Sequence, residues 1–553
     1  MALQKSVSTA SVAQATFAAT LVDEWSREGL RDVVICPGSR STPLTLAFAN
    51  RDEFTLHVRI DERSAAFFAL GRALATRRPV PIVVTSGTAA AEVHAAVAEA
   101  DLAHVPLLVL TADRPPELHG VGAPQAIDQR NLYGSMVRLY EEPGVTRADA
   151  AYSWRPLAQR LLVAARGDAG TAGPVHLNAA FVEPLLAEPD ELPPRRGVDR
   201  SPRDGPARRA EDLDVRGRRV LAVVGAGASR ELISDMRAAQ WVVIGDATAQ
   251  GTLPYGDPLV RHDAVWKILR PEVIVRVGGI PASKFLAQRL RSSSIEVIAL
   301  DAAGPVADPD GVVTSRMTGW PDATNARHVG DASYVELWRE ASGGLEKHLA
   351  SWWSEELDEI LVARVAVEMT NAHGASLVVG SSMPVRDVEW WCAPRDNATF
   401  ANRGANGIDG VVSTFLGVAY GASAIGLVGD VTMLHDVSAL VDGAGPDTRA
   451  VLVVSDNGGG GIFSFLDHAR DLASQQFETL FATSRPHDLA AVATAFGHHG
   501  ERVTSATQLR TAIEHGIERE GLSVVVAQVP TRDANVARHE ELNSLVAQWW
   551  TSR

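Results

Sequence analysis

The fold of this chain is decided by two hydrophobic runs that each end in an aspartate, Ala424-Ile425-Gly426-Leu427-Val428-Gly429-Asp430 and Ala450-Val451-Leu452-Val453-Val454-Ser455-Asp456. Such runs are typical of buried parallel strands, and ligands bind where parallel strands end. The aspartates are 26 positions apart, which leaves room for one crossover helix between neighbouring strands. Asp430, Asp456 and the Gly458 carbonyl would supply the hard oxygen ligands with which Mg²⁺ holds a phosphorylated ligand. Ordinary turn chemistry is the alternative for either turn taken alone.

The composition is that of a large soluble α/β protein. The chain has 553 residues, of which 46% are hydrophobic and 22% charged, and its length suggests about three or four domains. A formal net charge of −15 argues against nucleic acid or an anionic membrane as the main partner. The two cysteines, Cys36 and Cys392, exclude a disulfide framework and indicate a cytoplasmic protein.

Two stretches raise the question of a membrane. Residues 1–20 contain one lysine and no sustained apolar core, so we do not expect a signal peptide. Residues 411–428 carry no charge and are long enough to span a bilayer. This stretch is interrupted by glycines and leads directly into Gly429 and Asp430. It therefore predicts a buried helix followed by a buried strand, and no membrane contact.

Short hydrophobic strands alternate with helical patterns along the chain, which predicts an α/β fold with three doubly wound parallel-sheet domains. We expect a first domain at 1–187, a linker rich in Pro, Arg and acidic residues at 188–214, a central domain at 215–345 and a third domain at 346–553. The first and third domains are expected to be distantly alike. Helical patterns are predicted at 64–75, 88–100 and 334–368. Strands are predicted at 33–36, 81–84, 106–110, 174–177, 219–224, 241–244, 273–277, 296–300, 376–380, 399–401, 425–428, 451–455 and 524–529.

The turn Gly225-Ala226-Gly227 in the central domain is similar to a dinucleotide-binding fingerprint, and Asp246 follows at a suitable strand end. However, Arg230 occupies the position of the third glycine, which that motif needs for close packing of its helix and strand. A tight structural turn is the favoured interpretation.

Further motifs in the two outer domains resemble those of one enzyme family. The pair of turns at 429–430 and 456–458 resembles the thiamine diphosphate motif. Together, the motifs resemble the 2-succinyl-5-enolpyruvyl-6-hydroxy-3-cyclohexene-1-carboxylate (SEPHCHC) synthases of menaquinone biosynthesis. They lie in order at 36–44 (Cys-Pro-Gly-Ser-Arg-Ser-Thr-Pro-Leu), 61–65 (Asp-Glu-Arg-Ser-Ala), 85–89 (Thr-Ser-Gly-Thr-Ala), 113–118 (Asp-Arg-Pro-Pro-Glu-Leu), 402–410 (Asn-Arg-Gly-Ala-Asn-Gly-Ile-Asp-Gly) and 457–463 (Asn-Gly-Gly-Gly-Gly-Ile-Phe).

The resemblance implies a transferase that uses thiamine diphosphate with Mg²⁺ or Mn²⁺. It would decarboxylate 2-oxoglutarate and add the succinic semialdehyde unit to isochorismate, releasing CO₂. The first domain would bind the cofactor's pyrimidine and the third its diphosphate. Glu62 would protonate the aminopyrimidine so that C2 of the thiazolium can lose its proton. A helix N-terminal acid stabilised by the helix dipole is the structural alternative for Glu62.

The resemblance also implies roles for individual residues. Gln125 and Arg403 join Glu62 as catalytic candidates, and Ile408 would wedge between the cofactor rings to enforce a bent shape. Guanidinium groups suit substrates that carry two carboxylates. The cofactor-binding candidates are Glu62, Gly87, Ser382, Ile408, Asp430 and Gly458, and the metal ligands are Asp430, Asp456 and Gly458. Isochorismate would contact Ser39, Arg40, Arg114, Gln125 and Lys284, and the succinyl group would contact Ser382, Arg386 and Arg403.

Several of these residues have structural alternatives. Arg114 could pair only with Glu117, Lys284 could be a solvated surface lysine, and Ile408 could be a core residue. Two positions depart from the family pattern. Asp456 stands where asparagine is common, and Pro124 stands beside Gln125 where a second amide is common.

Two other functions remain open. Another thiamine enzyme, such as an acetolactate synthase or a 2-oxoacid decarboxylase, would share Glu62 and the metal turns but not the set Arg40, Arg114 and Arg403. A catalytically silent protein of the same fold is disfavoured because Glu62, both metal acids and Ile408 are all present. The resemblance further implies a homodimer or homotetramer with its site at the dimer interface.

Overall fold

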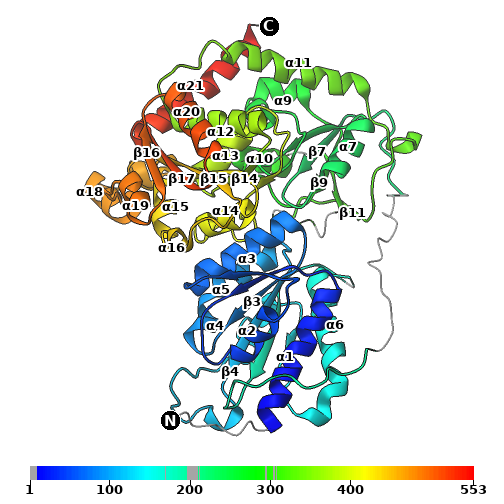
Figure 1. The fold of residues 1–553 in the computed structure, drawn as a ribbon. Helices are drawn as coiled ribbons and strands as arrows, with labels where there is room; N and C mark the ends of the chain where they lie inside the picture. Colours follow the sequence, from blue (N-terminus) through cyan, green and yellow to red (C-terminus); the bar gives the residue numbers. More distant parts are fainter. Residues whose placement is uncertain are drawn as a thin grey trace. The chain divides into compact units, whose positions relative to one another are not determined.

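The computed structural model describes residues 9–168, 170–195, 210, 212–292, 295–302, 306, 308–309 and 311–552. The chain divides into two compact units, one formed by Met1–Arg203 with Gly404–Val418 and the other by Asp204–Arg403 with Ala419–Arg553. The described residues contain three parallel sheets (Figure 1), which confirms the predicted fold class. Most of the predicted linker, at 196–209 and 211, lies outside the described residues.

The sheet of the first unit is doubly wound and has the strand order β2-β1-β3-β4-β6-β5, with all pairs parallel. The inner strands β3 and β4 are buried along their full length, as parallel strands covered on both faces must be. The strands are β1 (Asp32–Ile35), β2 (Thr55–Val58), β3 (Val80–Val84), β4 (Leu107–Asp113), β5 (Tyr140–Glu141) and β6 (Val175–Ala180).

Helices cover both faces of this sheet. One buried cluster joins α1, α2 and α6 to one face, and α3 and α5 pack on the other (Figure 1). The helices are α1 (Thr9–Arg27), α2 (Thr42–Ala49), α3 (Glu62–Thr76), α4 (Thr88–Glu92), α5 (His94–Leu102) and α6 (Trp154–Arg166), and α14 (Val411–Ala419) joins them from late in the chain.

The first sheet of the second unit has the order β11-β10-β9-β7-β8. One buried cluster on it contains α7, and a second joins α8, α9, α10 and α11 to the last helix, α21. The strands are β7 (Val220–Val224), β8 (Val242–Gly245), β9 (Val273–Val277), β10 (Glu296–Leu300) and β11 (Ser315–Met317). The helices are α7 (Arg230–Ala238), α8 (Gly256–Arg261), α9 (Asp263–Leu269), α10 (Lys284–Ser292), α11 (Ala332–Leu349) and α21 (Arg532–Thr551).

The second sheet of this unit has the order β13-β12-β14-β15-β17-β16, which repeats the order of the first unit's sheet. Helices α12, α13 and α20 share a buried cluster with one of its faces. The strands are β12 (Ser376–Val379), β13 (Thr399–Phe400), β14 (Ser423–Gly429), β15 (Arg449–Asp456), β16 (His499–Val503) and β17 (Gly521–Gln528). The remaining helices are α12 (Glu359–His373), α13 (Met383–Trp391), α15 (Asp430–His435), α16 (Ala439–Asp442), α17 (His468–Asp471), α18 (Ser474–Phe477), α19 (Leu489–Ala495) and α20 (Ala506–Glu518).

Three predicted helices differ from the structure. The stretch 334–368 is two helices, α11 and α12, because residues 350–358 leave the helical path and Asp358 caps the second helix through the Leu361 N–H. The stretch 88–100 is also two helices, which meet at Val93. Helix α3 begins at Glu62 rather than Ser64, since Asp61 accepts the Ser64 N–H as its N-cap. The predicted boundary at 345/346 falls inside α11, and the domain boundaries stay a prediction.

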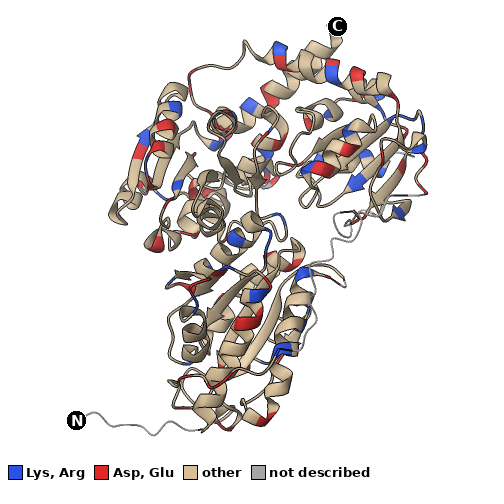
Figure 2. Cartoon of the chain, turned by 45° about the vertical axis from the view of Figure 1, so that its right-hand side comes forward, with Lys and Arg blue, Asp and Glu red and all other residues tan. Residues whose placement is uncertain are grey.

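Charged residues of both signs are spread along both units (Figure 2). Among the described residues, no helix combines the length and the apolar character needed to cross a bilayer. Residues 411–428 form helix α14 and most of strand β14, as their pattern predicts.

Helices α3 and α14 approach closely at glycines. A Cβ added to Gly71 would lie 2.1 Å from the Thr414 carbonyl oxygen, so we expect Gly71→Ala to destabilise the protein by about 1–3 kcal/mol despite its better helix propensity. The matched control is Gly343→Ala in α11, where a Cβ meets no atom within 4 Å and a gain of about 0.5–1 kcal/mol is expected. Calorimetric unfolding of both variants checks this, and a stabilising Gly71→Ala would contradict the close approach.

Candidate active site

Four neighbouring strand ends of the first unit carry predicted site residues. The sheet order β2-β1-β3-β4 places the loop after β2, with Glu62, beside the loop after β1, with Ser39 and Arg40. The loops after β3 and β4 follow, with Gly87 and Arg114. The winding direction changes between β1 and β3, and such a switch point is where doubly wound sheets bind ligands.

Arg40 and Arg114 form a cationic pair at this edge. Arg40 is only 5% exposed, donates from Nη1 to the Phe181 carbonyl at 2.9 Å and lies 3.3 Å from a Glu183 oxygen. Burial, and then the charge of Arg114, lowers the pKa of Arg40. Arg114 donates to the Pro124 carbonyl at 3.0 Å rather than pairing with Glu117. Two guanidinium groups within electrostatic reach of one another favour an anionic ligand.

Gln125 and Gly87 pack together beside this pair. The Gln125 amide donates to the Ser86 carbonyl at 3.2 Å, and the Ser86 hydroxyl donates to the Gln125 carbonyl at 2.9 Å. A Cβ on Gly87 would lie 2.9 Å from Gln125 Cγ, so only glycine fits there. Gln125 has a φ of +58°, a strained conformation for a non-glycine residue that is often kept at functional sites. Ser39 is exposed at the same edge.

Glu62 is the first residue of helix α3 and is partly buried. Burial is the main cause that raises the pKa of its carboxyl, and the charges of Asp61 and Glu92 raise it further. A carboxyl that holds its proton more strongly than usual is suited to donate a proton or a hydrogen bond to a ring nitrogen.

A buried glutamate that the sequence did not reveal holds the segment with Ile408. Glu99 on α5 is 3% exposed and accepts three backbone N–H groups, from Gly404 at 2.7 Å, Ala405 at 2.6 Å and Asn406 at 3.3 Å. Burial raises the pKa of Glu99, and these three donors oppose the rise. The turn that leads into Ile408 is thereby anchored in the first unit, which also contains Glu62.

The two predicted metal turns lie side by side in the second unit. Strands β14 and β15 are parallel neighbours, and Gly429 pairs with Ser455, so Asp430 and Asp456 follow adjacent strand ends. Asp430 is 7% exposed. Burial raises its pKa to about 6, and the charge of Asp456 adds to the rise. A buried carboxylate that lies beside a second carboxylate in this way favours a bound cation.

The surroundings of these aspartates suit a phosphate-bearing group. A Cβ added to Gly429 or to Gly458 would meet no atom within 4 Å, so both turns border open space. The Gly458 carbonyl oxygen accepts a hydrogen bond at 2.6 Å from Arg532, which also pairs with Glu478. Arg532 was not predicted, because nothing local marks the first residue of α21 as a partner of a turn 74 positions earlier. The residues present fit a metal-bound diphosphate.

A second unpredicted acid supports the metal turn. Glu359, the first residue of α12, is 5% exposed and accepts a hydrogen bond at 2.7 Å from the side chain of Asn457. The Asn457 side-chain oxygen accepts the Gly459 N–H at 3.1 Å. Asn457 lies between the two predicted ligands Asp456 and Gly458, so Glu359 fixes the shape of their turn.

The predicted oxoacid-binding residues gather at the end of β12. Ser382 caps α13 with a φ of +77°, the left-handed region that favours glycine, and Arg386 donates back to the Ser382 carbonyl. Burial, and then the charge of Arg403, lowers the pKa of Arg386, so the two guanidiniums lie within electrostatic reach. Arg403 donates to the Ile280 carbonyl at 3.1 Å. Lys284 is exposed at the start of α10, four residues after Ile280.

The switch point of the middle sheet is filled by its own backbone. A Cβ on Gly225 would lie 2.0 Å from the Gly279 carbonyl oxygen, so the turns after β7 and β9 are in contact. Asp246 accepts the Ala226 N–H at 2.9 Å and the Thr248 N–H at 2.8 Å. These bonds make Asp246 a support of the turn, as the structural interpretation of the glycine motif predicts.

Each unit thus carries its own set of predicted residues. The first unit contains Ser39, Arg40, Glu62, Gly87, Arg114, Gln125 and Ile408, and the second contains Lys284, Ser382, Arg386, Arg403, Asp430, Asp456 and Gly458. Within the described part of the chain, no three His, Cys, Asp or Glu side chains converge as a metal site. The metal site suggested by this geometry instead combines two carboxylates with one backbone carbonyl.

Comparison with known proteins identifies the family. The N-terminal binding domain of thiamine pyrophosphate enzymes matches residues 15–132, and the C-terminal binding domain matches residues 390–527. A SEPHCHC synthase of Myxococcus xanthus is 38% identical over 96% of this chain and 97% of its own length. The corresponding synthase of Thermobifida fusca is 40% identical over 90% of this chain and 93% of its own.

The chain belongs to the SEPHCHC synthase family. Its members are thiamine diphosphate-dependent enzymes, and so is this protein. The benzoylformate decarboxylase of Polynucleobacter necessarius has the same fold, with a TM-score of 0.68 and 16% identity over 94% of this chain and 98% of its own.

The Glu99 anchor generates a prediction. Glu99→Ala leaves three N–H groups of residues 404–406 without their acceptor, so we expect a loss of about 2–4 kcal/mol and faster hydrogen exchange there. Glu99→Gln keeps one acceptor oxygen, so its stability and exchange rate should lie between those of the parent protein and those of Glu99→Ala. The measurement is hydrogen exchange resolved to the peptide that contains residues 404–406. Glu117→Ala, at an exposed position, is the control and should leave this exchange unchanged. Unchanged exchange in Glu99→Ala would contradict the anchor.

Proposed function

We propose that this member of the family decarboxylates 2-oxoglutarate and adds the succinic semialdehyde unit to isochorismate, forming SEPHCHC and CO₂ in menaquinone biosynthesis. The observation that carries the proposal is the presence of two guanidinium pairs, Arg40 with Arg114 and Arg386 with Arg403, each within electrostatic reach. Both substrates carry two carboxylates, which guanidinium groups bind in bidentate fashion. A thiamine enzyme for an uncharged aldehyde or a monocarboxylate has less use for two such pairs.

Different residues of the chain would hold different parts of the cofactor. Asp430, Asp456 and the Gly458 carbonyl would bind Mg²⁺, or Mn²⁺, on the diphosphate, with Gly429 and Gly458 leaving room for it. Arg532, which donates a hydrogen bond to the Gly458 carbonyl, adds positive charge beside these groups. Gly87 and Ser382 would line the cofactor, and Ile408 would support its bent shape. Thiamine diphosphate supplies the nucleophilic carbon for 2-oxoacid decarboxylation and carbon–carbon bond formation.

Glu62 moves the proton in this proposal. Its carboxyl would give a proton to the aminopyrimidine ring nitrogen and so make the exocyclic nitrogen basic enough to remove the proton at C2. The raised pKa of Glu62 supports this role, because the group keeps its proton to higher pH than a solvated glutamate.

Substrate recognition is divided between the two sets of cations. Arg386, Arg403 and the Ser382 hydroxyl would hold the distal carboxylate of 2-oxoglutarate. Arg40, Arg114, Ser39, Gln125 and Lys284 would hold isochorismate. Gln125 and Arg403 would also orient the reacting groups, a contribution of position rather than of acid–base chemistry. The Pro124 carbonyl already orients Arg114 through a backbone hydrogen bond that does not depend on the side chain at this position.

We propose that the protein works as a homodimer, or a homotetramer, in which two chains complete each site. The support is that Glu62 and Asp430 belong to different compact units. A cytoplasmic location stays a prediction from the composition.

The reaction can be tested directly with the purified protein, Mg²⁺ and thiamine diphosphate. We expect 2-oxoglutarate to be consumed rapidly only when isochorismate is present, with the coupled product detected by mass spectrometry.

Glu62→Gln should lower turnover roughly 10²- to 10⁴-fold, the usual contribution of proton transfer, while retaining cofactor binding. The control Glu336→Gln, an exposed glutamate of α11, should stay within a few-fold of the parent.

Two results would contradict this proposal. Consumption of pyruvate in place of 2-oxoglutarate would indicate another thiamine enzyme and remove the role of the arginine pairs. Undiminished turnover in Glu62→Gln would remove its role in proton transfer.

The metal turns generate a second prediction. Asp430→Asn should weaken Mg²⁺-dependent binding of thiamine diphosphate by more than the roughly 10- to 100-fold that loss of an outer-shell partner costs. Asp456→Asn introduces the asparagine that is common at this position in the family and that still offers an oxygen ligand, so it should change the affinity less than about tenfold. Isothermal titration with the cofactor at fixed Mg²⁺ separates the two variants. Equal losses in both would show that Asp430 has no special place in the site.

A further inference from the structure

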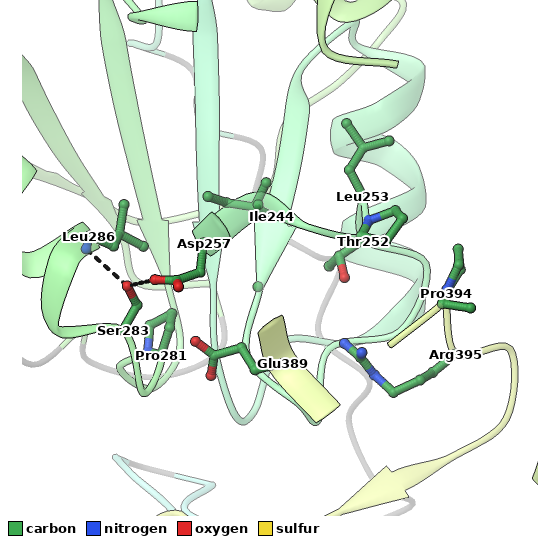
Figure 3. Close-up of a pocket in the computed structure, with 14 residues that line it drawn as sticks. Ile244, Thr252, Leu253, Asp257, Pro281, Ser283, Leu286, Glu389, Pro394 and Arg395 are labelled. Carbon is green, nitrogen blue, oxygen red and sulfur yellow. Dashed lines mark hydrogen bonds between the residues drawn. The ribbon is translucent and has the colours of Figure 1, made fainter. Parts of the chain in front are cut away.

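Glu389 is a buried acid that the proposed reaction does not use. It lies on α13, one turn after Arg386, and is 8% exposed. It borders a small pocket that Asp257, Ser283 and Arg395 also line (Figure 3). Burial, and then the charge of Asp246, raises its pKa to about 8. Burying a carboxyl group costs free energy unless hydrogen bonds within the protein replace those that it made to water.

The hydrogen bond of Glu389 holds a turn of the middle sheet. Its Oε2 accepts the backbone N–H of Ala282 at 2.9 Å. Ala282 belongs to the turn of residues 278–283, which connects β9 to α10, and Figure 3 shows the Glu389 carboxyl pointing toward this turn at Pro281. No cation forms an ion pair with Glu389 within the described ranges. Its contact is with the backbone, which fits a role in positioning.

The 278–283 turn contacts or leads into two of the proposed substrate-binding cations. Arg403 donates to the Ile280 carbonyl in the turn at 3.1 Å. Lys284 follows the turn directly as the first residue of α10. Arg386 lies on the same helix as Glu389. One hydrogen bond therefore joins the helix of one proposed substrate arginine to the turn that contacts the other.

The far end of the turn has a separate anchor. Ser283 donates its hydroxyl to Asp257 and accepts the Leu286 N–H at 2.9 Å, which caps α10 (Figure 3). Asp257 is also paired with Arg261. The start of α10 is thus fixed by Ser283 and Asp257, whereas Glu389 fixes the preceding part, which carries the Ile280 carbonyl.

We propose that Glu389 is a positioning residue for substrate binding: by holding the Ala282 N–H it sets the 278–283 turn so that Arg403 is presented together with Arg386 to a dicarboxylate. This inference rests on the proposed function and names the device that arranges its oxoacid-binding cations. Glu389 acts through the turn and does not itself touch the substrate.

The charge on Glu389 adds a readout that distinguishes positioning from simple packing. The charged groups that face it are Asp246 after β8, Asp257 on α8, Arg386 on α13, and Arg395 and Arg403 on the segments that follow α13. When Glu389 is protonated, Arg386 and Arg403 keep their full attraction for an anion. Ionisation above about pH 8 partly offsets that attraction, so the affinity for a dicarboxylate falls as the pH rises through this value.

The test uses the full-length protein and two substitutions of Glu389. In Glu389→Ala, without substrate, hydrogen exchange at the Ala282 amide should accelerate at least about tenfold, since its acceptor is lost. In the same variant KM for 2-oxoglutarate should rise roughly tenfold, while kcat changes less than about twofold. Glu389→Gln retains an acceptor oxygen and should keep KM within about threefold at pH 7. The Gln variant should also lose the rise in KM above pH 8.

A control variant and a folding check accompany these measurements. Glu336→Ala, an exposed glutamate of α11, should change neither exchange at Ala282 nor KM, and thermal unfolding checks that each variant is folded. Unchanged exchange at Ala282 in Glu389→Ala, or an unchanged KM despite faster exchange, would overturn the inference. Failure of the parent protein to consume 2-oxoglutarate would instead overturn the proposed function, because the exchange measurement needs no substrate. If Glu389→Ala does not fold, a Gln variant whose KM still rises above pH 8 would overturn it.

Discussion

Every strand of each sheet runs in the same direction, and the arrangement of the site residues follows from this constraint. Parallel neighbours can be joined only by a crossover, so the loops that leave their carboxyl ends collect at one edge. In both outer sheets the winding reverses between the first and third strands, where the diverging loops leave room for a ligand. Ser39 and Gly87 follow one such pair of strands, and Ser382 and Asp430 follow the other. The same strand order thus provides two half-sites of different chemistry.

The middle sheet has the same switch point but uses it differently. Its turns after β7 and β9 are in contact, with Gly225 against Gly279, so backbone occupies the space that a ligand would need. The turn after β9 instead continues toward Ile280, which contacts Arg403. In this sheet the switch point serves to hold a turn beside the proposed substrate-binding arginines.

Much of this arrangement could be predicted because its signals are local. The hydrophobic runs before Asp430 and Asp456 predicted two neighbouring strands, and the glycine turns predicted where they end. The helix break at 350–358 was missed because hydrophobic residues continue through it, although Asp358 is a recognisable cap. Glu99 and Glu389 could not be found in this way. Their partners are 305 and 107 positions away, and nothing in a helix pattern distinguishes an acid that will meet a backbone N–H from one that will meet water.

The buried acids share one physical logic. Glu99, Glu359 and Glu389 each accept N–H groups from a turn at the candidate site. A carboxyl group can accept hydrogen bonds on its oxygens whether it is ionised or protonated, and at these three positions it meets N–H donors of a turn in place of water. The pKa of Glu389 is raised from an ordinary value of 4.5 to about 8, so the folded protein binds a proton that the unfolded chain releases. The associated stability is full below about pH 4.5 and is lost as the pH rises through about 8. The hydrogen bond that holds the turn at Ala282 therefore belongs to a group whose contribution to stability depends on pH.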